Sequence, residues 1–402
     1  MNVDFTQVSQ ASQVVRRQSE GMAAVAQYLP VHAAIPAGDL GLLLQVLHPL
    51  NALIVGLGVQ VAQGGQRLLA TAADALDDTL EEYAQAERVG YDETAAVRRA
   101  FGAWVSPFED PRTAAPPLGP ATDGAPPGYG DGEPDLFSQA YGDGGDLARW
   151  VLEQPGRARD RVTELTTGSP CVSERQDVTS YLVPPVAGTS EIEEMRWSAG
   201  AVLGSLDWVF EQFMGWSFLE DVIFKPFAGD WDAINRASIA WEHAGDAVFA
   251  VAANLAPLPE ATRGWDGDAS EMFRAAAAAL SAAALALSRA AGTASGVVGT
   301  VGTVSRLAAV GMGMILRKLS EKLMRLAIEA SVPVAGWVVA AAEAALLVND
   351  IVASVKLAYT IVNLLYDAIA DVVEAQGDLV DTAYLIEDLA RYLGSSTVRA
   401  LT

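Results

Sequence analysis

Two amphipathic helices on either side of a tryptophan–glycine turn decide the fold: WDAINRASIAWEHAGDAVFAVAANL (231–255), GWDGD (264–268) and DASEMFRAAAAALSAAALALSRA (268–290). Glycine at such a turn supplies the positive φ that a helix end requires. Asp268 and Glu271 have the spacing of a capping box. The apolar residues recur three and four positions apart and predict two helices that pack as a hairpin. These residues are Ile234, Ala237, Trp241, Ala244, Val248, Val251 and Leu255, then Phe273, Ala276, Leu280, Ala283 and Leu287.

The N-terminal hundred residues predict a second hairpin. A helix is expected over 4–29, with Asp4 and Gln7 as its capping box and Pro30 as its end. A second helical region over about 40–100 contains Pro49, which marks a kink or a restart. The apolar positions with helical spacing are Phe5, Val8, Ser12, Val15, Ser19, Met22, Ala26 and Leu29, then Leu69, Ala73, Leu76, Leu80 and Tyr83.

The rest of the chain suggests three domains and an all-α fold, with helical hairpins in a four-helix-type bundle and additional C-terminal helices. Residues 1–104 form the N-terminal hairpin. Residues 105–195 are a Pro/Gly-rich linker and irregular region that we expect not to order itself. Residues 196–402 form a helical domain that holds seven of the nine tryptophans, and six of them lie close together: Trp197, Trp208, Trp216, Trp231, Trp241 and Trp265. Within it, Gly292 and Gly296 would permit a close helix contact.

Composition excludes several classes of function. A formal charge of −24 argues against nucleic acid as a partner, because phosphate binding needs Lys and Arg. The single cysteine, Cys171, and three dispersed histidines do not support a zinc site or a Ser/His/Asp hydrolase. There is no phosphate-binding glycine motif. We therefore expect no enzymatic activity, no catalytic residue, no metal and no cofactor.

A Y-x-x-x-[D/E] pentapeptide ends the second helix of the N-terminal hairpin. Tyr83 and Glu87 are four residues apart and therefore lie one above the other on a helix, where a receptor would read an aromatic ring and an acid together. A second match begins at Tyr384 and ends at Asp388. Position favours Tyr83, but the sequence leaves both alternatives open.

The turn Trp265-Asp266-Gly267 between two such helices resembles the WxG-type hairpins and PPE proteins of actinobacterial type VII (ESX) secretion. Residues 1–100 resemble their PE partners, and the resemblance also covers 230–290. It implies a bundle in which the WxG turn lies beside the end of the Y-x-x-x-E helix. Tyr83, Glu87, Trp265 and Gly267 would then form one composite secretion signal.

The resemblance further implies a leaderless substrate that is secreted or placed at the cell surface by a route other than Sec. No Sec signal is legible, because Asp4 comes early and no compact apolar core follows Arg16 and Arg17. The partners would be the secretion ATPase and chaperone, with self-association, small helical hairpin proteins or a membrane as further partners. Such a protein would act outside the cell in a structural, delivery or membrane-acting role.

Two alternatives stay open. The first is a pore-forming or toxin-delivery module, since polymorphic toxins of this route carry similar N-terminal regions. Residues 306–330 are basic and adjoin apolar segments, although each uncharged run there is shorter than the roughly 20 residues of a membrane span. The second alternative is a cytoplasmic chaperone or scaffold for small secreted hairpins, which would expose unpaired apolar helix faces.

Overall fold

The computed structural model describes residues 3–40, 44–130, 172–186, 230–330 and 376–389, together with positions 360, 363, 367, 370 and 391. The chain is all-α, as the sequence predicts. Its main helices are α1 (Phe5–His32), α3 (His48–Ala100), α9 (Trp231–Leu255), α10 (Leu258–Ala261) and α11 (Asp268–Ala330).

Short 3₁₀ turns connect or flank these helices: η1 (Ala37–Asp39), η2 (Gln45–Leu47), η3 (Pro111–Ala114) and η4 (Val178–Tyr181). Within the described ranges no β-strand occurs, and the single β-bridge joins Asp123 to Gln176. Several residues named from the sequence lie outside the described residues: Cys171, Trp197, Trp208 and Trp216.

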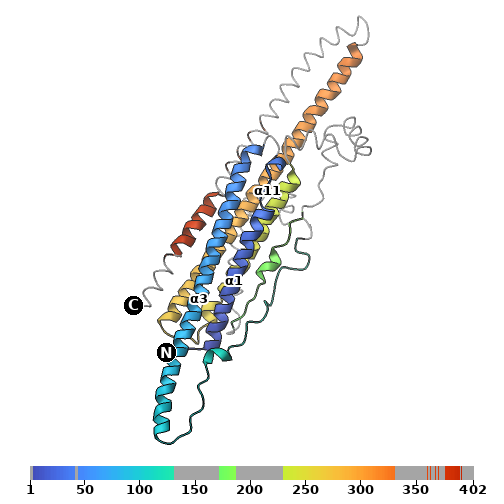
Figure 1. Ribbon diagram of the computed structural model, residues 1–402. Coiled ribbons are helices and arrows are strands. Elements are labelled where there is room, and N and C mark those ends of the chain that lie inside the picture. The colour runs from blue at the N-terminus through green and yellow to red at the C-terminus, as the bar shows by residue number, and fades with distance from the viewer. Residues whose placement is uncertain are drawn as a thin grey trace.

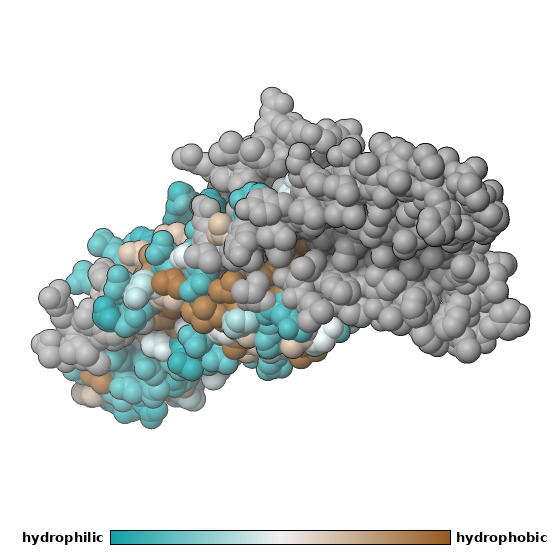
Figure 2. Space-filling view, turned by 90° about the horizontal axis from the view of Figure 1, so that it is seen from above, coloured by the Kyte–Doolittle hydropathy of each residue, from teal (hydrophilic) through white to brown (hydrophobic). Residues whose placement is uncertain are grey.

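The four long helices α1, α3, α9 and α11 pack side by side as a bundle (Figure 1). The predicted apolar faces are confirmed, since their members are buried on all four helices except for Phe5 and Tyr83, which are partly buried. Both halves of the chain contribute to one continuous hydrophobic core. Seen from above, the described surface is mainly hydrophilic, and its hydrophobic residues gather in a band near the middle (Figure 2).

A glycine on α3 makes room for the largest core side chain of α9. A Cβ atom at Gly58 would lie 2.6 Å from Cη2 of Trp241 and 3.1 Å from Cδ1 of Leu29. Real Cβ atoms do not come so close, so the indole occupies space that only glycine leaves. The contact joins α1, α3 and α9 at one point.

Two helices are much longer than their neighbours. α3 has 53 residues and α11 has 63, compared with 28 in α1 and 25 in α9. At about 1.5 Å per residue, α3 and α11 extend roughly 80 and 95 Å, about twice the length of α1 and α9. The end of α3 and the end of α11 consequently project from opposite ends of the bundle (Figure 1).

The helix boundaries differ from the predicted ones at two places. α1 continues through Pro30 to His32, where the Tyr28 and His32 rings stack 4.5 Å apart. The glycine-rich stretch after Gly292 stays helical inside α11. A Cβ atom at Gly292 would meet nothing within 4 Å. The close approach is instead at Gly245 of α9, where a Cβ atom would lie 3.3 Å from the Ser288 carbonyl oxygen and 3.7 Å from the Gly292 nitrogen. A Cβ atom at Gly302 would lie 3.4 Å from Cγ2 of Ile234.

The predicted capping boxes form only in part. The carboxylate of Asp4 accepts hydrogen bonds from the amides of Thr6 and Gln7, but Oε1 of Gln7 is buried without a hydrogen-bond partner. At α11 the carbonyl of Gly267, rather than Asp268, accepts the first helical bonds. Pro49 does mark a restart, because it occupies the first turn of α3.

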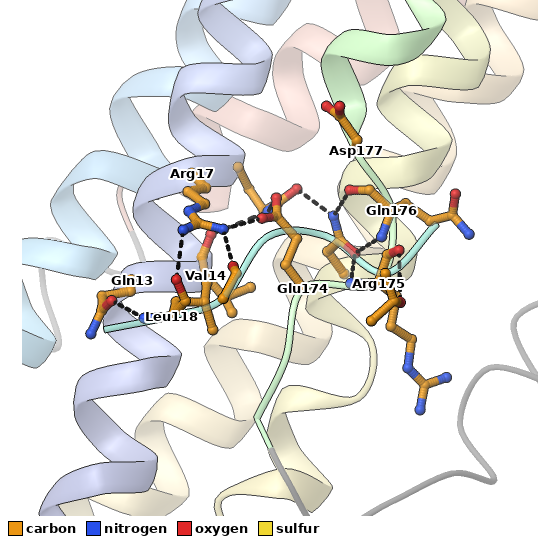
Figure 3. A network of polar contacts seen from close by, with 12 residues as sticks. Gln13, Val14, Arg17, Leu118, Glu174, Arg175, Gln176 and Asp177 are labelled. Atoms are coloured by element: carbon orange, nitrogen blue, oxygen red, sulfur yellow. Dashed lines mark hydrogen bonds and ion pairs between the residues drawn. The ribbon is translucent and has the colours of Figure 1, made fainter. Parts of the chain in front are cut away.

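The linker is ordered where the structure describes it, contrary to the prediction. Residues 115–130 and 172–186, here called the strap, run together over α1 and α9. Arg17 donates to the carbonyls of Leu118 and Gly119 and to Glu174 at 3.0, 2.6 and 2.7 Å (Figure 3). Charge-assisted bonds to side chains on the helices thus replace the apolar surface that a Pro/Gly-rich segment lacks.

A buried amide continues this network into α9. Asn254 is fully buried, accepts the backbone N–H groups of Arg175 and Gln176 and donates to Gln18. Gln18 in turn donates to Glu174. The strap therefore connects the N-terminal hairpin to the hairpin of α9 and α11 through buried polar groups that all have hydrogen-bond partners.

A second group of contacts holds the far end of the strap. Tyr28 donates to the Val183 carbonyl at 2.7 Å, and Nδ1 of His243 lies 3.1 Å from the same oxygen. Tyr129 donates to Asp246 and stacks on His243. Burial is the main cause that lowers the pKa of His243, which is 3 % exposed.

We expect Gly58→Ala to lower the free energy of unfolding by about 1–3 kcal/mol, because the new methyl group overlaps the Trp241 ring. Gly56→Ala is the matched control, since nothing lies within 4 Å of its Cβ position. There alanine should stabilise the helix by up to about 1 kcal/mol. Urea unfolding followed by far-UV circular dichroism measures both, and equal effects would contradict the close contact.

We also expect acid to weaken the strap. A histidine whose folded pKa is lowered stabilises the fold above its unfolded pKa of about 6.5, and this stabilisation is lost as the pH falls below that value. Between pH 7 and pH 5, His243→Gln should therefore lose less stability than the wild type. The difference is at most about 1.4 kcal/mol per pH unit for one proton.

The control for acid sensitivity is His48→Gln, on the half-buried first residue of α3. The comparison separates the loss of the His243 contact from the loss of a histidine elsewhere in the chain. Identical pH slopes of unfolding free energy for His243→Gln and the wild type would show that the His243 contact is not coupled to folding.

Candidate functional site

The chain between α9 and α11 ends in a tight turn that contains Trp265. The backbone N–H of Trp265 donates to the Thr262 carbonyl at 3.1 Å, and Gly267 has φ +119°. A side chain would be strained at that φ, so glycine is required at this position. Gly264 is restricted for a different reason, because a Cβ there would lie 2.9 Å from Oε1 of Gln7.

The indole of Trp265 is buried between two helices and is 1 % exposed. Its Nε1–H donates to the hydroxyl of Tyr83 at 3.4 Å, and the two rings meet edge to face with centroids 6.5 Å apart. The ring of Phe273 from α11 lies on another side of the indole, with the two ring centroids 5.8 Å apart. Arg274 donates to the Trp265 carbonyl at 2.7 Å and to the Thr262 carbonyl at 3.2 Å, which fixes the turn.

The structure thus brings two of the four predicted site residues, Tyr83 and Trp265, into direct contact from positions 182 residues apart. Glu87 lies one turn further along α3 and is exposed, and Gly267 is exposed at the turn. The tyrosine and tryptophan serve packing, while the glutamate and the glycine turn remain at the surface.

The second Y-x-x-x-D match is in a different environment. Tyr384 is 63 % exposed on the helical segment 376–389. Arg391 forms ion pairs with Glu387 and Asp388 at 2.5 and 3.1 Å, so both acids next to this tyrosine are already paired. Ile386 and Leu379 anchor the segment in the core. Tyr384 makes no aromatic contact like the one between Tyr83 and Trp265 within the described structure.

A shallow open hollow lies beside the turn and is lined by Ala256, Pro259, Glu260, Arg263 and Arg274. The Glu260–Arg263 ion pair at its edge is 2.5 Å long. No group of three or more His, Cys, Asp or Glu side chains suited to a metal ion occurs among the residues that the structure describes. The one described histidine that is fully buried, His243, contacts the strap.

Sequence reasoning missed the residues that hold the turn. Arg274 was not singled out from the sequence, yet it donates hydrogen bonds to two carbonyls of the preceding loop. Gln7 was read as a capping residue, yet it lies against Gly264. Neither contact has a local sequence signal, because each joins residues by tertiary packing.

Comparisons with protein-family models, with curated proteins and with solved structures found no match to this chain. The class of protein that the fold and site define is therefore an all-α helical bundle with an aromatic contact between its two hairpins.

We expect Tyr83→Phe to lower the free energy of unfolding by about 1 kcal/mol, because it leaves the buried Nε1–H of Trp265 without an acceptor while keeping the ring. Tyr384→Phe is the matched control on an exposed tyrosine and should change stability by less than about 0.5 kcal/mol. Denaturant unfolding measures both, and equal losses would argue against the Tyr83–Trp265 hydrogen bond.

Proposed function

We propose that this protein is a substrate of a type VII secretion system whose export signal is composed of Tyr83, Glu87, Trp265 and Gly267. The single observation that carries the proposal is the contact between Tyr83 and Trp265. The resemblance to PE and WxG/PPE-type proteins implies this juxtaposition. The corresponding partners are the secretion ATPase and chaperone, and the corresponding location is outside the cell or at its surface.

The folded state supports an intramolecular signal. Tyr83 and Trp265 come from different hairpins that share one core, and the strap binds α1 and α9 by buried polar contacts. A receptor that reads Glu87 and the Gly267 turn together would recognise the folded chain and ignore an unfolded one. In this proposal, separate subunits are replaced by two halves of one polypeptide.

A chaperone or scaffold for small helical hairpins receives less support. That function requires unpaired apolar faces that can accept a client helix. The predicted faces of α1, α3, α9 and α11 are instead buried against one another.

Pore formation is favoured by one observation. Among the described residues, the stretch Asp268–Gly302 of α11 is long and apolar enough to cross a membrane, since it contains an 18-residue window with a mean hydropathy of 1.4. Core helices of soluble proteins have the same property, and its apolar face packs on α9. Leakage of dye from liposomes at acidic pH tests this alternative, and intact vesicles at every pH would rule it out.

The test of the export proposal is secretion in the native host, measured in culture filtrate and cell pellet, with and without the secretion ATPase. Glu87→Gln is the sharpest change, because Glu87 is exposed and its loss leaves the core intact. We expect roughly tenfold less protein in the filtrate, which corresponds to about 1.4 kcal/mol of recognition.

The matched control is Glu82→Gln, which removes another exposed acid from the same helix and should be exported normally. Asp388→Asn tests the second pentapeptide. Normal export of Glu87→Gln with loss of export in Asp388→Asn would transfer the signal to Tyr384. Retention of the wild type in the pellet would refute the export proposal as a whole.

A further inference from the structure

Beyond the Tyr83–Trp265 site, α3 continues as a projection that ends in exposed aromatic residues. Phe101 is 87 % exposed, Trp104 is 82 % exposed and Val97 is 58 % exposed. Arg98 and Arg99 are exposed beside them. We call these five residues the aromatic tip. Large apolar side chains so fully in water are unusual for a soluble domain, and grouped at one point they mark an interaction site.

The chain that follows α3 folds back and is held against the projecting end of the helix. The amide of Gly102, which has φ +75°, donates to the Arg99 carbonyl, and the amide of Ala103 donates to that of Arg98. The hydroxyl of Tyr91 donates to the carbonyl of Ser106, and the Tyr91 ring lies 5.4 Å from that of Phe108. These contacts hold the loop against α3, so the exposed side chains are presented on a fixed support.

Charge at the aromatic tip is opposite to that of the protein. The chain carries −24, yet residues 94–107 contain two arginines and no acid. Along α3 the nearest acids are Asp92 and Glu93, which lie about 10–12 Å before the end of the helix at about 1.5 Å per residue. Ala100 lies roughly 26 Å beyond Tyr83, which is about three times the screening length of about 8 Å at physiological salt.

We propose that the aromatic tip docks the protein end-on to an anionic lipid bilayer. Tryptophan favours the headgroup level, the Phe101 ring fits the upper acyl region, and the two arginines bind phosphate groups. End-on approach keeps the acidic body away from the surface, which a side-on approach would not. The inference rests on the exposed tip and does not depend on the export proposal.

The test uses the full chain and vesicles of phosphatidylcholine alone or with 30 % phosphatidylserine, by cosedimentation at physiological salt. We expect binding to the anionic vesicles. Arg98→Gln with Arg99→Gln should weaken it by about 25-fold, at about fivefold per arginine. Phe101→Ala with Trp104→Ala should weaken it at least about tenfold, because the inserted apolar surface is removed.

The matched controls are Arg67→Gln with Arg289→Gln, which remove the same charge at two exposed positions elsewhere, and Tyr384→Ala, which removes an exposed aromatic. Both should bind like the wild type, and all variants should unfold at the same denaturant concentration as the wild type. Binding that the tip variants retain, equal binding to neutral vesicles, or no vesicle binding would overturn the proposal. So would tip variants that lose self-association and leave vesicle binding unchanged, because the tip would then be a protein contact.

Discussion

The burial of α9 on nearly all its sides is the constraint on which the rest of the structure depends. Its residues Ile234, Trp241, Val251 and Leu255 are at most 1 % exposed, and a helix with so much apolar surface is stable only inside a bundle. α11 covers one side of it and the N-terminal hairpin covers another. The close fit of Trp241 to Gly58 sets the position of α9 against α3, and the Trp265 turn then falls beside Tyr83. The aromatic contact is thus a consequence of how the core packs.

The strap adds a polar constraint to this apolar one. Hydrophobic burial is not directional, so several helix orders would bury similar surface. The network of Arg17, Glu174, Gln18 and Asn254 is directional, since Arg17 and Gln18 of α1 bond to Glu174 of the strap and Gln18 also accepts a hydrogen bond from Asn254 of α9. Buried polar groups left without partners are costly, which disfavours other arrangements of the same helices. A segment that joins the two halves of the chain therefore also helps to specify how they dock.

Helical periodicity was sufficient to predict the all-α fold and the buried faces, because three- and four-residue spacing reports directly which side of a helix meets the core. Local rules failed where tertiary contacts outweigh them. Pro30 does not end α1, and the glycines after Gly292 do not break α11, where small residues such as Gly302 permit close packing on α9. The ordered strap had no periodic signal, since side chains on distant helices hold it. The contact of Tyr83 with Trp265 was anticipated from a family resemblance, whereas the roles of Arg274 and Gln7 depend on three-dimensional proximity alone.

In the proposed export signal, α3 and the tryptophan turn are read as one unit. The most direct measurement is a double-mutant cycle in export, with Glu87→Gln, Trp265→Phe and the two combined, each normalised to the folded protein in the cell. If one receptor reads a single composite surface, the double variant should be exported no worse than the poorer single variant, because either change already disrupts recognition. Effects that multiply would show two independent signals and would contradict the claim.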